Sequence, residues 1–370
     1  YQTENLIYDG TRTLVYRGKK RDEGKAVVLK KPRQQYPSFN ELLQMRNQYA
    51  LTKKLAIPGI VKPIALEKEG NNYVLVMEDV GGVSLSQYYK NRPLSLEEFF
   101  PVAIALTKIL SNLYQHRVIH KDIKPSNILI NPETKEIFLI DFSIASLLPR
   151  ETQQLKNPNV LEGTLAYISP EQTGRMNRGI DYRSDFYSLG VTFYQLLAGQ
   201  LPFISDDAME LVHCHIAKMP AALGKRQEAI GNRGVTEEIP GVLSDIVLKL
   251  MAKNAEDRYQ SAKGLERDLT ECWQQWQHSG TVDRFELGRR DKSDRFLIPE
   301  KLYGREREVQ TLLGAFDRIA NPSHTPHTSH TPHPPHTRQK GGGMEMMLVA
   351  GFSGIGKTAV VSEIHKPIVE

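Results

Sequence analysis

The sequence is poor in features that would each point to a particular class of protein. It holds 2 cysteines among 370 residues, and they form no CxxC pair. So few cysteines exclude a disulfide-built scaffold and favour a reducing, cytoplasmic location. No apolar run approaches the ~20 residues that cross a bilayer, so we expect no membrane segment. The net charge of +5 is spread along the chain without a basic block, so we expect no nucleic-acid partner.

The two ends of the sequence lack other features. It begins YQTENLIYDG, without a starting methionine and without the basic and apolar segments of a signal peptide. It stops at HKPIVE, just after what we interpret as the first helix of a new domain. We therefore expect this sequence to be part of a longer protein.

The composition that is present is globular, with 40% hydrophobic and 25% charged residues, enough for a packed core. Residues 1–80 contain four segments rich in apolar and β-branched residues and one segment with helical spacing. These are LIYD, TLVYRG, AVVLK and YVLVMEDV, and the helical FNELLQMRNQYALTKKL. Helical spacing recurs at 96–116, 184–199, 243–253 and 261–276. The pattern predicts a β-rich lobe with one helix, followed by a mainly helical lobe.

The character of the sequence changes after this region. Residues 277–300 are charged and aperiodic, which predicts a linker, and 301–320 have helical spacing. Residues 321–343 are a low-complexity stretch rich in His, Pro and Gly, and its repeated prolines exclude a helix. Histidine recurs there at every third position, and we favour an insert without a specific role over a metal site.

The strongest chemical signal is HKDIKPSNILI at 120–130, followed by IFLIDFS at 137–143. Two short apolar strands flank a polar loop here. Transfer of a phosphoryl group needs positioning and charge neutralisation more than covalent chemistry. Asp122 is suited to accept the proton of a hydroxyl nucleophile, and Lys124 to hold a γ-phosphate. Asn127 and Asp141 offer the oxygen ligands that Mg²⁺ prefers.

The combination HxDxKxxN followed by DFx resembles the catalytic and metal loops of protein kinases. GTLAYISPE at 163–171 resembles the end of a kinase activation segment, and Thr164 with Lys124 marks the serine/threonine branch. SDFYSLGV resembles the helix whose aspartate, Asp185, braces the catalytic loop. Arg258 in EDRY matches the arginine that pairs with Glu171 of the SPE sequence.

The resemblance implies an α+β, bilobal protein kinase fold over residues 1–276. It implies a serine/threonine protein kinase that transfers the γ-phosphate of ATP to protein substrates with Mg²⁺ as cofactor. The alternative is a pseudokinase-like nucleotide-binding module. It would regulate an ATPase domain that we expect to follow it in the chain, at residues 301–370. We favour activity because Asp122, Lys124, Asn127 and Asp141 are all present.

The expected nucleotide-binding half is less regular. Aligned on Val15, the three positions of the family's glycine-rich loop hold Tyr8, Gly10 and Thr13, so only the central glycine remains. The resemblance implies that Lys30, in the strand with Val28, holds the α- and β-phosphates. Strand alternation turns Lys31 to the opposite face.

Other positions of the family pattern also differ here. Counting back from Pro58 places Gln48 where kinases carry the glutamate partner of Lys30, which exchanges a charge-assisted bond for a neutral one. Ser143 replaces the glycine of DFG, and Lys121 replaces the arginine of HRD. Lysine cannot make the bidentate phosphate contact of arginine, so we expect weak dependence on loop phosphorylation.

The connecting strand YVLVMEDV resembles the kinase hinge, and it implies adenine contacts from the backbone of Glu78 and Val80.

The last segment contains GFSGIGKT at 351–358, a full GxxxxGK[ST] between a strand pattern and a helix pattern. Such loops cradle phosphates with backbone N–H groups. We therefore expect phosphate contacts from Gly351, Gly356 and Lys357, and a Mg²⁺ contact from Thr358. KLYGREREVQTLL resembles the lead into AAA-type ATPases, so residues 301–370 are expected to begin such an α/β P-loop domain, interrupted by 321–343. The domain order resembles large bacterial sensor proteins, which implies C-terminal signalling modules of the same longer chain as partners.

Overall fold

The computed structural model describes the chain except residues 91, 148–162, 176–178, 225–237, 293–305 and 321–370. The chain divides into two compact units, residues 1–296 and 297–370, which we describe separately.

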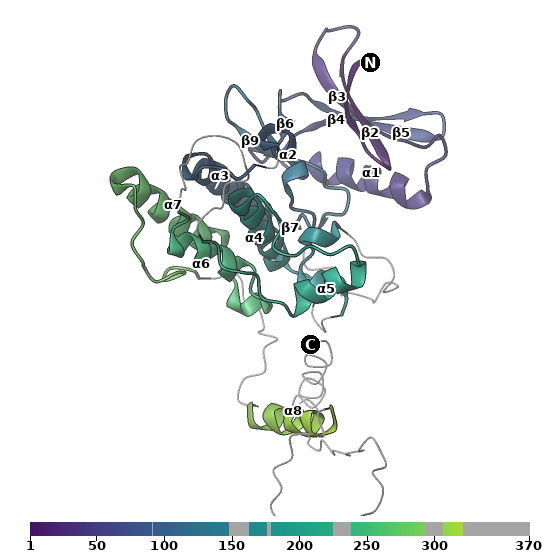
Figure 1. Cartoon of the computed structure of the whole chain (residues 1–370). Helices are drawn as coiled ribbons and strands as arrows, with labels where there is room; N and C mark the ends of the chain where they lie inside the picture. Colours follow the sequence, from purple (N-terminus) through teal and green to yellow (C-terminus); the bar gives the residue numbers. More distant parts are fainter. Residues whose placement is uncertain (91, 148–162, 176–178, 225–237, 293–305, 321–370) are drawn as a thin grey trace, which may run out of the picture. The chain divides into compact units, whose positions relative to one another are not determined.

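The N-terminal lobe of the first unit is an antiparallel five-stranded sheet in the order β1-β2-β3-β5-β4, with helix α1 beside it (Figure 1). Its elements are β1 (Gln2–Asp9), β2 (Thr13–Lys19), β3 (Ala26–Pro32), α1 (Phe39–Thr52), β4 (Pro63–Glu69) and β5 (Asn72–Glu78). Val27, Leu29 and Val76 form its buried core. Strand alternation directs these apolar residues to one face. Leu75 of β5 and Met45 of α1 are buried in the same lobe.

Helix α1 begins at a capping box. The Ser38 hydroxyl accepts from the N–H of Glu41 at 3.3 Å, and the Glu41 carboxylate accepts from the N–H of Ser38 at 2.8 Å. Two N-terminal N–H groups of the helix end are thereby satisfied. The helix buries Met45, Gln48 and Leu51, so a polar amide lies on its inward face.

The second lobe is mainly helical (Figure 1). Its helices are α2 (Leu85–Tyr89), α3 (Leu96–Gln115), α4 (Tyr182–Ala198), α5 (Ala208–Ile216), α6 (Gly241–Leu250) and α7 (Ala262–Ser279). Helix α4 is buried along nearly its whole length, contacts α3 and α6, and is the centre of this lobe. A helix buried on all sides needs apolar residues all round, and Phe186, Leu189 and Phe193 of α4 are fully buried.

Two small sheets line the helical lobe near the first lobe. One has the order β6-β8-β9, formed by β6 (Val83–Ser84), β8 (Ile128–Ile130) and β9 (Ile137–Leu139). The other pairs β7 (Val118–Ile119) with β10 (Ser146–Leu147). Their loops hold the polar residues singled out in the sequence.

Ordered structure continues past residue 276. Helix α7 runs to Ser279 and ends at Gly280, whose φ of +67° suits glycine. The carboxylate of Asp291 accepts from the N–H of Gln260 at 2.6 Å and from the hydroxyl of Ser261 at 2.7 Å. The first part of the predicted linker 277–300 thus contacts the helical lobe. A charged, aperiodic stretch gives no sign of a single carboxylate that docks in this way.

The described part of the second unit is helix α8 (Glu306–Ala320), within the segment 301–320 predicted as helical. The predicted insert 321–343 lies outside the described residues. Across the described part of the chain, we find no helix with the length and apolarity that a membrane crossing requires.

Candidate active site

Hairpin β8–β9 brings the two predicted metal ligands together. Ile128 pairs with Leu139 in this hairpin, and the N–H of Ile140 donates to the carbonyl of Asn127 at 2.9 Å. Asn127 precedes β8 and Asp141 follows Ile140. Because antiparallel partners face each other across a ladder, both residues lie at the same end of the hairpin.

The predicted proton acceptor and phosphate-binding lysine form one group with Thr164. Lys124 Nζ lies 2.7 Å from Asp122 Oδ2 and also donates to the Thr164 hydroxyl. The N–H of Thr164 donates to Asp122 Oδ1 at 3.2 Å. The Asp122 and Lys124 side chains are 13% and 19% exposed. The carboxylate is therefore oriented yet reachable.

Asn127 completes this group. Its amide nitrogen donates to the carbonyl of Asp122 and to Asp122 Oδ2, both at 2.9 Å. Because these bonds use the nitrogen, the amide oxygen of Asn127 is the atom that remains for a cation.

The loop backbone is held from helix α4, as the resemblance implied. Asp185 accepts from the N–H of His120 at 2.8 Å and from the N–H of Lys121 at 2.7 Å. Burial raises the pKa of Asp185, and His120 and Lys121 offset only part of this. His120 Nδ1 accepts from the N–H of Asp122 at 3.2 Å, so Nε2 carries the proton and donates to the carbonyl of Ile140 at 2.9 Å.

Two residues of these loops have left-handed backbone conformations. Lys121 has a φ of +70° and Asp141 a φ of +65°. Such values are uncommon outside glycine and cost energy for a residue with a Cβ. The contacts around each loop must therefore hold it in place.

Lys30 reaches across from β3 to the metal loop. Its Nζ lies 2.8 Å from Asp141 Oδ1 and 3.1 Å from Gln48 Oε1, which confirms that Gln48 faces Lys30. Burial raises the pKa of Asp141, but the charge of Lys30 and its hydrogen bond outweigh this and lower the pKa to about 2. Asp141 is thus ionised at neutral pH. Lys31 instead lies over the Tyr16 ring, as strand alternation predicted.

Helix α1 makes a second contact with the metal loop that sequence reasoning missed. The Asn47 amide nitrogen donates to the carbonyls of Ser143 at 3.2 Å and Ala145 at 3.0 Å. Nothing in the sequence signals this contact, because the residue type of Asn47 does not indicate its partner.

The hairpin between β1 and β2 matches the alignment on Val15. Tyr8 pairs with Val15, and the N–H of Gly10 donates to the carbonyl of Thr13 at 3.0 Å. A Cβ on Gly10 would overlap the Tyr8 ring. A larger residue at this position would therefore have to displace the exposed ring of Tyr8.

The connecting segment after β5 has its backbone groups partly bonded. Val28 faces Met77 in the β3–β5 register. The N–H of Glu78 donates to the carbonyl of Lys62 at 3.0 Å, and the carbonyl of Val80 accepts from Asn131 at 2.8 Å. The carbonyl of Glu78 and the N–H of Val80 are not used in these two bonds. We therefore expect adenine contacts from these two backbone groups.

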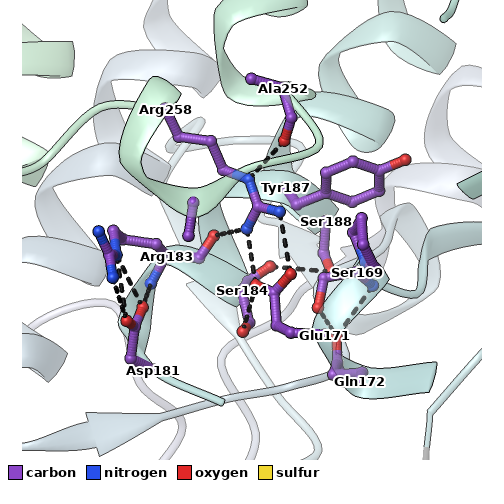
Figure 2. A network of polar contacts seen from close by, with 12 residues as sticks. Ser169, Glu171, Gln172, Asp181, Arg183, Ser184, Tyr187, Ser188, Ala252 and Arg258 are labelled. Carbon is purple, nitrogen blue, oxygen red and sulfur yellow. Dashed lines mark hydrogen bonds and ion pairs between the residues drawn. The ribbon is translucent and has the colours of Figure 1, made fainter. Parts of the chain in front are cut away.

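A buried ion pair anchors the segment after Thr164 (Figure 2). Arg258 Nη1 and Nη2 lie 2.6 and 2.9 Å from the two carboxylate oxygens of Glu171, and the Ser184 hydroxyl donates to the same carboxylate at 2.7 Å. Arg258 also donates to the carbonyl of Ala252 at 2.7 Å. Burial raises the pKa of Glu171, but Arg258 outweighs it and the net pKa is lowered.

The structure thus brings together Asp122, Lys124, Asn127 and Thr164 in one group, and Lys30, Gln48 and Asp141 in another. Gly351, Gly356, Lys357 and Thr358 lie outside the described residues.

Comparisons with known proteins agree with this geometry. The family model "Protein kinase domain" matches residues 1–270. Serine/threonine-protein kinase PrkC of Bacillus subtilis is 31% identical over 274 residues, covering 73% of this chain and 40% of that protein. PknB of Mycobacterium leprae, another serine/threonine-protein kinase, is 33% identical over 196 residues, covering 53% of this chain and 29% of the relative.

A third relative is the hybrid signal transduction histidine kinase G of Dictyostelium discoideum. It is 28% identical over 363 residues, covering 75% of this chain and 10% of that protein. This chain spans at most 40% of the length of these three relatives. The family match covers the β-rich lobe and the helical lobe together, which confirms the predicted bilobal protein kinase fold. The chain therefore belongs to the protein kinase family.

Proposed function

We propose that this protein is an active serine/threonine kinase that transfers the γ-phosphate of ATP to hydroxyl groups of protein substrates. The observation that carries the proposal is the hydrogen-bonded group of Asp122, Lys124, Asn127 and Thr164. Phosphoryl transfer depends on positioned charges, and this group holds a carboxylate and an ammonium within 2.7 Å of each other.

Each residue of the group has a role in this proposal. Asp122 accepts the proton of the attacking hydroxyl, and Asn127 and the N–H of Thr164 hold its carboxylate in orientation. Lys124 provides a positive charge beside the same carboxylate and holds the γ-phosphate. In these roles only Asp122 changes its charge, because it is the group that takes up the proton.

Asp141 and the amide oxygen of Asn127 fit Mg²⁺, because both are hard oxygen ligands and Asp141 is ionised at neutral pH. Bound Mg²⁺ would neutralise charge on the phosphates. Lys30 would hold the α- and β-phosphates while it remains paired with Asp141.

Adenine and the phosphates have further expected contacts in the first lobe. Val15 and Val28 would cover adenine, and Glu78 and Val80 would bond it through their backbone groups. Gly10 would lie over the phosphates at the hairpin tip. The register of β2, β3 and β5 supports this placement, because it aligns Val15 with Lys30 and Val28 with Met77.

Incubation of the full chain with radiolabelled ATP and a generic serine-rich protein such as casein tests the activity. Asp122→Asn should reduce transfer by roughly 10²–10⁴-fold and leave the dissociation constant of ATP nearly unchanged. Asp245→Asn is the matched control, because Asp245 is an exposed residue of α6. Transfer by Asp122→Asn at the control rate would contradict the assignment of the proton acceptor.

A nucleotide-binding regulatory module is the second candidate. The neutral Lys30–Gln48 contact and the Tyr8 ring at Gly10 favour it, because both differ from a glycine-rich, charge-paired ATP site. The same assay distinguishes the two functions. Binding of Mg²⁺·ATP without any phosphate incorporation by the unaltered protein would favour the regulatory module.

We also propose the domain division 1–276, 277–300 and 301–370, with the last segment beginning an AAA-type P-loop ATPase that contains the insert 321–343. The sequence GFSGIGKT supports it. Titration with an ATP analogue should then give two sites per chain, and Lys357→Ala should remove one. A single site in the unaltered chain would contradict this.

The cytoplasm is the proposed location. Cys214 and Cys272 are buried free thiols, which suits a reducing compartment. The proposed partners are protein substrates and further signalling modules of a longer chain.

A further inference from the structure

Gln172 uses both ends of its side-chain amide for buried contacts. Its Oε1 accepts from the N–H of Ser169 at 3.1 Å and from the Ser169 hydroxyl at 2.9 Å, a pair of contacts drawn in Figure 2. Its Nε2 donates to the carbonyl of Lys121 at 2.9 Å. Gln172 is 8% exposed. The side chain therefore links the turn that carries Glu171 to the loop that carries Asp122.

The carbonyl that Gln172 holds belongs to the peptide unit between Lys121 and Asp122. The N–H of the same unit, that of Asp122, donates to His120 Nδ1 at 3.2 Å. Because a peptide unit is planar, contacts at its two polar groups fix its orientation. A rotation of this plane would move the Cα of Asp122 and its carboxylate with it.

Lys121 has particular need of such contacts. Its φ of +70° is a conformation that a residue with a Cβ keeps only where the surroundings hold it. Asp185 binds its N–H at 2.7 Å, and Gln172 binds its carbonyl. The two contacts come from different segments, helix α4 and the turn Pro170–Thr173.

The segment 163–173 therefore contacts Asp122 directly through Thr164 and indirectly through the Lys121 carbonyl that Gln172 binds. Thr164 donates its N–H to the carboxylate at 3.2 Å, and Gln172 holds the preceding carbonyl. Glu171, between them in the chain, is fixed by Arg258. Docking of this segment and alignment of Asp122 are thereby connected through the hydrogen bonds of Thr164 and Gln172.

We propose that Gln172 is a positioning residue for Asp122: it aligns the proton acceptor by holding the carbonyl of Lys121, and so makes transfer depend on docking of the segment 163–173. This inference rests on the proposed kinase activity. In this role Gln172 acts through the Lys121 carbonyl that it binds.

Gln172→Glu changes only one end of the side chain. Its carboxylate still accepts from Ser169, but an oxygen replaces the nitrogen that donates to Lys121. At pH 8 we expect kcat to fall about tenfold or more, because a buried carbonyl loses its donor. The KM for Mg²⁺·ATP should change less than about twofold, because ground-state nucleotide binding is not altered.

The same variant has a pH signature that a purely structural role would not produce. Burial raises the pKa of a carboxyl group, so Glu at position 172 takes up a proton as the pH falls. The protonated group has an O–H that donates to the carbonyl of Lys121. The ratio of variant to unaltered kcat should therefore rise toward one between pH 8 and pH 6.

Gln260→Glu is the matched control. The Gln260 amide nitrogen also donates to backbone carbonyls, those of Ala255, Glu256 and Arg258, but it has no contact with the catalytic loop. This variant should lower the melting temperature without a pH-dependent loss of kcat. Gln172→Met, which lacks donor and acceptor, should lose kcat at every pH.

All kinetic measurements use the full chain at a temperature where circular dichroism shows each variant folded. A kcat equal to that of the unaltered protein in both Gln172 variants overturns the positioning role and leaves the kinase activity standing. A loss in Gln172→Glu that Gln260→Glu reproduces, or that does not recover at low pH, overturns it as well. If Gln172→Glu does not fold, the kcat of Gln172→Met decides. Absence of transfer by the unaltered protein overturns the proposed function, and the positioning role with it.

Discussion

The nucleotide side and the substrate side of this domain hold their polar groups in different ways. On the substrate side, Glu171 and Arg258 form an ion pair whose side chains are 4% and 0% exposed. On the nucleotide side, the hairpin pair of Asp9 and Arg33 is 55% and 46% exposed. The pair on the substrate side is thus buried, whereas the hairpin pair on the nucleotide side is exposed to solvent. The nucleotide side also holds the partly buried pair of Lys30 and Asp141.

The sequence departs from the kinase pattern on both sides. Tyr8, Thr13 and Gln48 are departures on the nucleotide side. Lys121 is a departure in the catalytic loop. A change at an exposed pair costs little because solvent already screens it, and a neutral amide at the buried position of Gln48 brings no charge to desolvate. Removing one member of a buried ion pair leaves an uncompensated charge. The buried pair of the substrate side should therefore tolerate fewer substitutions than the exposed hairpin pair of the nucleotide side.

The largest expected effect is at the buried pair. Arg258→Met should lower the free energy of unfolding by about 3–5 kcal/mol, because it leaves Glu171 buried without its partner. Denaturant titration measures this. Arg92→Met is the control, because Arg92 pairs with Glu98 at a site where its side chain is 53% exposed, and it should cost less than ~1 kcal/mol. An equal loss of unfolding free energy in the two variants would contradict the difference proposed between buried and exposed pairs.

The pH dependence of the same variant provides a second check. In the unaltered protein the pKa of Glu171 is lowered from 4.5, so its contribution is present above that value and is lost as pH falls through the lowered pKa. Without Arg258, burial alone raises the pKa of Glu171. Its contribution to stability should then decrease as pH rises, the opposite sign.

The next effect concerns the metal loop. Asp141→Asn should weaken ATP binding in the presence of Mg²⁺ by about tenfold or more, because a charge-assisted contact contributes roughly 1.5–3 kcal/mol. In EDTA the affinity should be unchanged or higher, since a carboxylate near the phosphates is removed. Calorimetric titration with and without Mg²⁺ measures both. An equal loss in the two conditions would argue against Asp141 as a metal ligand.

A smaller effect is expected at the neutral contact of Lys30. Gln48→Glu should strengthen it by about 1 kcal/mol, the difference between neutral and charged hydrogen bonds. ATP affinity or kcat should rise by up to about tenfold. Asp141 already pairs with Lys30 at 2.8 Å, so repulsion between two carboxylates works against this gain. Gln48→Ala is the comparison. If Gln48→Ala, Gln48→Glu and the unaltered protein have the same ATP affinity and kcat, Gln48 has no role in the nucleotide site.

The smallest effect is expected at the hairpin. Arg33→Met removes the exposed pair with Asp9 and should change the free energy of unfolding by less than ~1 kcal/mol. ATP affinity should stay within about twofold. A larger loss of affinity would show that this pair shapes the phosphate-binding hairpin, and that the nucleotide side is less tolerant than its exposure suggests.

The sequence was sufficient where a local pattern is tied to chemistry. Catalytic-loop spacing predicted the positions of Asp122 and Asn127, and strand alternation separated Lys30 from Lys31. Counting back from Pro58 along the kinase pattern predicted that Gln48 faces Lys30, and the structure confirms this contact. The first two predictions each depend on a short stretch of chain, and the third depends on the resemblance to the family.

Contacts between neutral amides and distant backbone could not be predicted. Asn47 reaches two carbonyls of the metal loop, and Gln172 reaches Lys121. An amide can bond almost any carbonyl, so residue type gives no sign of the partner. The contacts of Asp291 with the helical lobe were equally hidden, because a carboxylate can accept from almost any N–H or hydroxyl group.

The left-handed backbone conformations of Lys121 and Asp141 limit the substitutions that a mutational library would retain at these two positions. At Lys121 the backbone, with a φ of +70°, sets the limit, so glycine and asparagine should survive more often than valine or isoleucine. At Asp141 the φ of +65° combines with the need for a negative charge. Glycine would adopt this backbone conformation easily but would leave Lys30 without its carboxylate partner. Glutamate would keep the negative charge but would be strained in this backbone conformation. Position 141 should therefore accept fewer residue types than position 121, although the two share almost the same backbone angle.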